Sequence, residues 1–367
     1  MKQREEYTLK KEENTPKKVM MAMSGGVDSA VGALMLKKAG YDVKGVTMQL
    51  HGENVSLGEQ SCSTAKDVED AARVSAEIGI PFESYHMEAD FAKCVIEPFV
   101  WAYEHGATPN PCVECNRYMK FARLHQLAKE QGFDYLATGH YARIEEKEGR
   151  FLLKKGKDDT KDQSYMLYSL TQEQLSRTLF PLGELPKTET RDIAAKAGFA
   201  NSQKPDSQDI CFVPDGNYAR FIEAYTKKQY PEGDFVKPDG TVIGKHQGII
   251  RYTIGQRKGL GIALGAPAYV CKILPEENQV VIGEQKDLFT ANLMATDVNW
   301  IAFDTLQEPI RCKAKTRYRQ KEEWATVSPL PDGKVSVRFD MPLRAITPGQ
   351  SVVFYDGDRI LFGGMIE

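Results

Sequence analysis

Apolar and polar positions alternate on two scales between Lys18 and about Tyr141. Short runs of β-branched and apolar residues predict strands at Val19–Met23, Asp42–Met48, Phe82–His86 and Tyr135–Thr138. Longer segments with apolar residues at helical spacing predict helices at Asp28–Ala39, Thr64–Ile78, Ala89–Glu104 and Arg117–Glu130. Three of them are expected to stop at Gly40, Gly79 and Gly132. This alternation predicts an α/β fold with a doubly wound parallel sheet.

The pattern changes after this region. Residues 143–157 predict a hairpin that ends in a basic loop, KKGKDDTKDQSYM, and helical spacing returns at Thr171–Thr178 and Glu189–Ala197. We interpret this part as an insertion or appendage on the α/β domain. A short helix is predicted around Tyr218–Lys228, and short alternating strands with the turns PDGT, PDGK and YDGD then run to the C-terminus.

These changes divide the 367 residues into parts of ordinary domain size. We expect a flexible tail at 1–17, a catalytic α/β domain at 18–215, a small linking domain at 216–285 and a C-terminal β-barrel at 286–367. Hydrophobic residues make up 41% and charged residues 27%, and no apolar run approaches the roughly 20 residues that span a bilayer. The first eighteen residues mix Lys with Glu and resemble no targeting peptide. We therefore expect a cytoplasmic protein without a membrane partner.

The net charge is −3 and the pI about 6.2, so any contact with nucleic acid must rely on local basic patches. Seven cysteines without an export signal are expected to be reduced thiols. Packing or surface positions are expected for Cys62, Cys94, Cys271 and Cys312. Candidates for chemistry are Cys112, Cys115 and Cys211, which lie in unusual surroundings.

A strand, VMMAM, runs directly into Ser24-Gly25-Gly26-Val27-Asp28-Ser29 and then into a helix. This order directs backbone N–H groups and a helix dipole at an anion, which favours phosphate binding. The lysine of a Walker A loop is missing. The segment resembles instead the SGGxDS loop of PP-loop ATP pyrophosphatases, which cleave ATP between the α and β phosphates. The alternative is a glycine-rich turn in which Asp28 or Ser29 caps the helix.

That resemblance implies ATP with Mg²⁺ and an adenine nucleotide alpha hydrolase-like domain. It implies a nucleotide site made by Ala22, Met23, Ser24, Gly25, Gly26, Val27, Asp28, Ser29, Met48 and Gly139. The loop would hold pyrophosphate. The last two residues would contact adenosine, because both follow predicted strands at the edge where open α/β sheets bind ligands. Taken alone, either would be an ordinary core or turn residue.

Two segments, TPNPCVECN and KPDSQDICF, each place a cysteine in a predicted loop beside an apolar or helical segment. A loop thiol near a helix N-terminus can be activated by a lowered pKa. Together with the phosphate loop, ATGHYA, KDQSYML and a C-terminal KxRYR, these segments resemble the bacterial tRNA-specific 2-thiouridylase family, MnmA/TrmU, over nearly the whole chain.

The resemblance implies that Cys211 bears sulfur as a persulfide loaded by a donor protein, and that Cys115 is the second catalytic thiol. The target would be the wobble uridine of tRNA, activated as an adenylate. The products would be 2-thiouridine, AMP and pyrophosphate, with either a Cys115–Cys211 disulfide or released sulfide.

One position departs from the family pattern. Cys112 stands where many members have Asp, which removes a carboxylate near the target base. The resulting C-x-x-C pair and Cys211 offer three thiolates that could hold a 4Fe–4S iron–sulfur cluster. Such pairs also serve zinc or redox roles, so no metal is assigned.

Contacts with RNA follow from the same resemblance. Asn110, Pro111 and Cys112 match its target-base segment. Matches to its tRNA contacts are His140, Lys161, Asp162, Gln163, Arg317, Tyr318 and Gln350. From the residues alone, Lys313 to Arg319 would be a strand with cations on one face and a ring for stacking, or an edge strand protected by charge. A second basic loop in the linking domain, expected to touch the RNA backbone, contains Arg251, Gln256, Arg257 and Lys258.

We therefore predict an ATP-dependent tRNA-uridine 2-sulfurtransferase that acts as a monomer. Two alternatives stay open. A PP-loop ligase that adenylates a small molecule would not need Cys115, Cys211 or a basic β domain. A tRNA-binding or iron–sulfur protein without turnover would bind tRNA but release no AMP.

Overall fold

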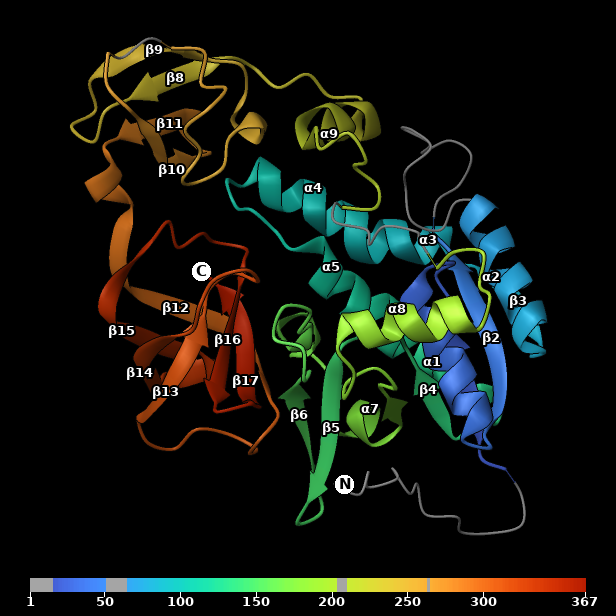
Figure 1. The fold of residues 1–367 in the computed structure, drawn as a ribbon. Coiled ribbons are helices and arrows are strands. Elements are labelled where there is room, and N and C mark those ends of the chain that lie inside the picture. The colour runs from blue at the N-terminus through green and yellow to red at the C-terminus, as the bar shows by residue number, and fades with distance from the viewer. Residues whose placement is uncertain (1–15, 51–64, 203–209, 263–264) are drawn as a thin grey trace.

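The computed structural model describes residues 16–50, 65–202, 210–262 and 265–367 (Figure 1). Figure 1 shows an α/β part, a small sheet above, and a barrel beside the α/β part, with the β5–β6 hairpin between the last two. Within these residues no helix is both long and apolar enough to cross a membrane.

The α/β part is built on a five-stranded parallel sheet in the order β3-β2-β1-β4-β7. Its strands are β1 (Lys18–Ala22), β2 (Asp42–Gln49), β3 (Phe82–His86), β4 (Tyr135–Ala137) and β7 (Thr178–Leu179). The central β1 is buried on both faces, since Val19 and Met21 pack with one core cluster and Met20 with the other. The order reverses beside β1, which makes the carboxyl end of β1 a site for ligands. The predicted doubly wound α/β fold is confirmed.

Helices cover both faces of this sheet. Most lie where periodicity placed them: α1 (Val27–Lys38), α2 (Ala65–Ile78), α3 to α4 (Glu88–Phe91, a π-helical turn Ala92–Ile96, Glu97–Glu104), α7 (Gln172–Ser176), α8 (Lys187–Lys196) and α9 (Tyr218–Thr226). Gly40, Gly79 and Gly132 have positive φ, so the predicted stops are confirmed.

The helix predicted from Arg117 begins six residues earlier. It runs through α5 (Pro111–Glu114), a π-helical stretch (Cys115–Leu124) and α6 (His125–Glu130). The prediction of a loop at Cys112 and Cys115 is therefore wrong. Proline fits the first turn of a helix, where its missing N–H has no partner to lose, so Pro111 starts this helix instead of breaking it.

The linking part forms a four-stranded sheet in the order β10-β11-β8-β9. Its strands are β8 (Gly233–Val236), β9 (Val242–His246), β10 (Tyr269–Leu274) and β11 (Gln279–Gly283). The barrel comprises β12 (Phe289–Trp300), β13 (Ile310–Lys315), β14 (Glu323–Pro329), β15 (Val335–Arg344), β16 (Ser351–Asp356) and β17 (Arg359–Ile366). Pairing of β12 with both β15 and β17 closes it. The predicted turns join β8 to β9, β14 to β15 and β16 to β17.

Two details of the β region differ from expectation. The strand β13 ends at Lys315, so the prediction that it includes Arg317, Tyr318 and Arg319 is wrong, and these residues form the following turn. The hairpin β5 (Ala142–Lys147) and β6 (Arg150–Lys155) exists as predicted, but β6 pairs with β17 and extends the barrel sheet. The hairpin therefore joins the barrel to the α/β part.

Candidate nucleotide and thiol site

The phosphate loop connects β1 to α1 with little room for side chains. Gly25 has φ +68°, and a Cβ there would lie 2.6 Å from the Asp67 carbonyl oxygen. A Cβ at Gly139 would lie 2.8 Å from the amide nitrogen of Ser29, so the end of β4 presses against the same loop. The Ser29 hydroxyl donates to the Gly26 carbonyl at 3.1 Å and accepts from the Ser24 amide at 3.2 Å. The loop is thus fixed by its own backbone and serines.

A lysine far along the chain reaches this loop. Lys187, the first residue of α8, donates from Nζ to both carboxylate oxygens of Asp28, at 2.7 and 2.8 Å. The Tyr141 hydroxyl donates to the same carboxylate at 2.8 Å, and its oxygen lies 3.0 Å from the Thr190 hydroxyl, from which it can accept. The lysine side chain is 9% exposed and that of Asp28 is 31% exposed. A buried cation therefore stands at the phosphate loop, where a Walker lysine is missing.

Sequence reasoning missed Lys187 and Tyr141. The lysine is the first residue of a helix that we predicted only from Glu189. The apolar spacing of that helix does not indicate that Lys187 pairs with Asp28, which lies 159 residues earlier. A further missed contact comes from Asn201, whose buried amide donates to the Gly25 carbonyl at 3.0 Å.

The two residues predicted to contact adenosine lie at neighbouring strand ends. Met48 is buried near the end of β2, and Thr47 before it donates to the carbonyl of Met23 at 2.5 Å. Gly139 follows β4, which pairs with β1 on the other side. The structure thus brings the predicted nucleotide residues together around the carboxyl end of β1.

The thiol residues come from two segments that pack against one core. Cys115 and Cys211 are partly buried against the same apolar cluster, whereas Cys112 is exposed on α5. Asn110 precedes α5, and its amide lies 3.6 Å from the sulfur of Met166. Residues 203–209, most of the second cysteine segment, lie outside the described residues. Cys62 does too.

The described residues contain no group of three or more His, Cys, Asp or Glu side chains close enough together to hold a metal ion. Cys112, Cys115 and Cys211 are all among the described residues, and the 4Fe–4S cluster stays a prediction. Packing roles suit two other cysteines, because burial raises the pKa of Cys312 to about 12 and that of Cys271 above its usual value.

The segment before α5 is held by the barrel. The Gln350 amide donates to the carbonyls of Thr108 and Pro109, at 2.7 and 3.3 Å, and the Thr108 amide donates to the Pro348 carbonyl at 2.8 Å. A Cβ at Gly349 would lie 3.2 Å from the backbone of Thr108. The barrel therefore fixes the chain that leads into the predicted target-base residues.

His140, the residue after Gly139, is buried inside the protein. It shares a 2.7 Å hydrogen bond with the Thr138 hydroxyl and lies against the rings of Phe121 and Phe180. Burial, and then the charge of Lys120, hold the pKa of His140 well below its usual value. The imidazole is accordingly neutral at physiological pH.

The other predicted tRNA contacts gather where the barrel meets the α/β part. The Tyr318 hydroxyl donates to the Asp162 carbonyl at 3.0 Å, and the Asp162 carboxylate is buried, where it accepts from the amides of Gly156 and Ser164. The guanidinium of Arg317 donates to Thr347 at 2.7 Å, and burial lowers its pKa. These side chains are held at the junction.

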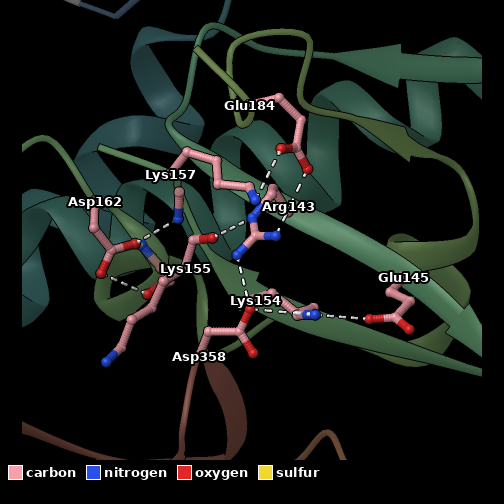
Figure 2. Close-up of polar contacts among 10 residues, drawn as sticks. Arg143, Glu145, Lys154, Lys155, Lys157, Asp162, Glu184 and Asp358 are labelled. Atoms are coloured by element: carbon pink, nitrogen blue, oxygen red, sulfur yellow. Dashed lines mark hydrogen bonds and ion pairs between the residues drawn. The ribbon is translucent and has the colours of Figure 1, made fainter. Parts of the chain in front are cut away.

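Charged side chains join the hairpin to both neighbours (Figure 2). Arg143 on β5 donates to Asp358 at 2.8 Å and lies 3.6 Å from Glu184, while Lys154 on β6 bridges Glu145 and Asp358 at 2.8 and 3.2 Å. Asp358 belongs to the turn of the barrel between β16 and β17, and Glu184 lies three residues before Lys187. The junction is therefore continuous with the segment that carries the buried lysine.

Three family models match successive parts of the chain. They are described as tRNA methyl transferase HUP domain (residues 17–215), tRNA methyl transferase PRC-barrel domain (219–284) and Aminomethyltransferase beta-barrel domain (290–366). The tRNA-specific 2-thiouridylase MnmA of Clostridioides difficile is 51% identical over 354 residues, which are 96% of this chain and 98% of that protein. The protein of the same name from Clostridium perfringens is 51% identical over 356 residues, 96% and 99% of the two chains. A solved 4-thiouridine synthetase–RNA complex with bound ATP is 21% identical, with a TM-score of 0.37 over 56% of this chain and 50% of that chain.

Proposed function

The chain belongs to the family of the tRNA-specific 2-thiouridylase MnmA, and from this membership we propose that it uses ATP to replace the C2 oxygen of the wobble uridine of tRNA with sulfur. The observation that carries the proposal is the site itself. A PP-loop with a buried cation and two thiols packed on one core cluster belong to the same α/β part.

The nucleotide half of the reaction needs a cradle for phosphates and charge to offset them. The glycine-rich turn and the start of α1 direct backbone N–H groups to this place, and Lys187 supplies a positive charge. Attack of the uridine C2 oxygen on the α phosphate would release pyrophosphate and leave the oxygen as an adenylate. Mg²⁺ would offset the negative charge of the triphosphate.

The sulfur half would use both thiols. A persulfide on Cys211, loaded by a sulfur-donor protein, attacks C2 through its outer sulfur, and AMP leaves with the former uridine oxygen. The Cys115 thiolate then attacks the inner sulfur, so the S–S bond breaks, 2-thiouridine is released and a Cys115–Cys211 disulfide forms. An external thiol must supply two electrons to restore the pair. If Cys115 attacks before transfer, sulfide is released and becomes the nucleophile.

The position of Cys115 on a helix suits this role. The π-helical stretch is packed on the core, with Met119 and Phe121 fully buried. A thiol on a rigid element is positioned more accurately than one on a loop. The segment before it is held by Gln350, so the target-base residues Asn110, Pro111 and Cys112 would meet the base at a fixed place.

The experiment is mass spectrometry of nucleosides from unmodified tRNA incubated with ATP, Mg²⁺ and a sulfur donor. Wild-type protein should form 2-thiouridine, and Cys115→Ser and Cys211→Ser should not. Cys271→Ser, a thiol of the linking part, is the matched control and should keep activity. Absence of 2-thiouridine from wild type, with a working sulfur supply, would contradict the proposal. AMP release without tRNA but with a small acceptor would then favour the ligase.

Iron analysis after anaerobic purification separates the persulfide route from a cluster. Active protein without iron excludes the cluster. If iron and sulfide are present in stoichiometric amounts and are lost together with activity, a cluster mechanism would replace the persulfide steps.

A further inference from the structure

The loop of residues 156–163, between β6 and the next helical turn, touches both partners of the Asp28 carboxylate. It follows the hairpin that joins the barrel, and it carries the predicted tRNA contacts Lys161, Asp162 and Gln163. Its hydrogen bonds run to Lys187 on one side and to Tyr141 on the other. The loop is therefore placed to set the geometry of the phosphate site.

The first link is made by Asp158. One carboxylate oxygen accepts from the backbone amide of Lys187 at 2.9 Å, and the other accepts from the amide and hydroxyl of Thr160 at 3.0 and 2.6 Å. The Lys187 amide is the first of α8 and has no partner within its own helix. Alongside this bond, the Lys157 amide donates to the Gly183 carbonyl at 2.8 Å. The loop thus anchors the segment 183–187 near both ends.

The second link is made by Gln163. Its side-chain oxygen accepts from the backbone amide of Tyr141 at 3.0 Å, and its backbone amide donates to the Tyr141 carbonyl at 2.9 Å. Tyr141 is buried, and its hydroxyl donates to Asp28. Gln163 therefore bonds to both the backbone N–H and the backbone carbonyl of Tyr141, the residue whose hydroxyl donates to Asp28.

The loop itself is stiffened from within and attached to the barrel. The carboxylate of Asp162 accepts from the amide of Gly156 at 3.1 Å and from that of Ser164 at 3.0 Å, which closes the loop at both ends. The Tyr318 hydroxyl of the barrel donates to the Asp162 carbonyl at 3.0 Å. A short series of hydrogen bonds thus lies between the barrel turn and the phosphate loop.

We propose that Asp158 and Gln163 are positioning residues for the ATP site, which act through Lys187 and Tyr141 to fix the cation and the hydroxyl around Asp28. They need not touch the nucleotide. The inference rests on the proposed function only for the identity of the nucleotide. Because it concerns ATP binding, it can be tested even if the thiolation assay detects no 2-thiouridine.

The test is calorimetric titration of the full-length chain with Mg–ATP, without tRNA. Asp158→Ala should raise the Kd for ATP about tenfold, because a charge-assisted hydrogen bond to the Lys187 backbone is lost. Asp158→Asn keeps one acceptor and should recover most of the affinity. The control is Asp159→Ala, which removes an exposed carboxylate from the same loop and should match wild type. The affinity for tRNA, from filter binding, should stay within about twofold of wild type in all three.

A double-mutant cycle separates positioning from a general structural role. In a Lys187→Met background Asp158→Ala should have no further effect on the Kd for ATP, since the residue through which it acts is gone. An equal effect in both backgrounds would overturn the proposal, as would wild-type affinity of Asp158→Ala. If circular dichroism shows that the alanine variant does not fold, Asp158→Ser replaces it in the same test. The serine hydroxyl is too short to replace both carboxylate oxygens of Asp158.

Discussion

Removal of the Lys187 ammonium group is the sharpest perturbation of the proposed ATP site. Lys187→Met keeps most of the length and volume of the side chain but removes its terminal ammonium group. Of the three hydrogen bonds to Asp28, the one from the Tyr141 hydroxyl then remains. The free energy of unfolding should fall by only about 1–2 kcal/mol, because Asp28 is 31% exposed and water can replace part of the lost interaction.

The effect on catalysis should be larger. A unit charge about 4 Å from a phosphate oxygen is worth about 4 kcal/mol at an effective dielectric constant near 20. Without the lysine, the negative charge of Asp28 is also no longer neutralised beside the triphosphate. We therefore expect kcat/KM for AMP formation to fall between about a hundredfold and a thousandfold, the range seen when one preorganised charge or donor is removed.

The assay is release of AMP and pyrophosphate from α-labelled ATP in the presence of tRNA and a sulfur donor. Lys196→Met is the matched control, since it removes an exposed lysine from the last turn of the same helix and should retain full activity. Binding of tRNA should be unchanged in both variants. AMP formation by Lys187→Met within threefold of wild type would refute the reasoning, because the phosphates would then not depend on this cation.

Three further results are expected. Gln350→Ala should lower 2-thiouridine formation about tenfold, at unchanged calorimetric affinity for ATP, because it frees the chain before α5. Trp324→Ala should weaken tRNA binding about tenfold in filter assays, since its 46% exposed ring lies beneath Arg311 and Lys313 as a stacking platform, and wild-type affinity would exclude this face. The depressed pKa of His140 contributes stability above about pH 6.5 that is lost as the pH falls. The free energy of unfolding in urea should therefore fall more for wild type than for His140→Asn between about pH 7.5 and 5.5, and equal losses would contradict the assignment.

The α/β part could be predicted closely because its signals are local. Periodicity and three glycine stops placed the strands and most helices within one or two residues of their observed ends. The hairpin was also predicted, but not its partner strand. The pairing of Lys154 with Arg359 joins residues 205 positions apart, and an alternating pattern says which face of a strand is apolar, not which strand lies beside it.

The error at Cys115 has a definite physical origin. The prolines and asparagines of TPNPCVECN suggested a loop, and the apolar spacing became clear only from Arg117 onward. Proline is nevertheless well tolerated in a first turn, and the helix continues with π-helical hydrogen bonds that shift its apolar face. The chemistry inferred for the thiol is unaffected, but the thiol lies on a packed helix and not on the predicted loop.

The predicted tRNA contacts show what a motif cannot distinguish. Asp162 is a poor direct ligand for a phosphate, since its carboxylate is negative, buried and bonded to two amides of its own loop. Tyr318 and Gln350 likewise use their polar groups on neighbouring backbone. A sequence motif identifies such positions but does not say whether the side chain contacts RNA itself or positions a neighbouring segment that contacts RNA. Their contact with tRNA stays a prediction, whereas their hydrogen bonds already fix how the barrel sits against the site. Substitution of these residues should therefore change both tRNA binding and the geometry of the site, and only separate measurements of tRNA and ATP affinity can tell the two effects apart.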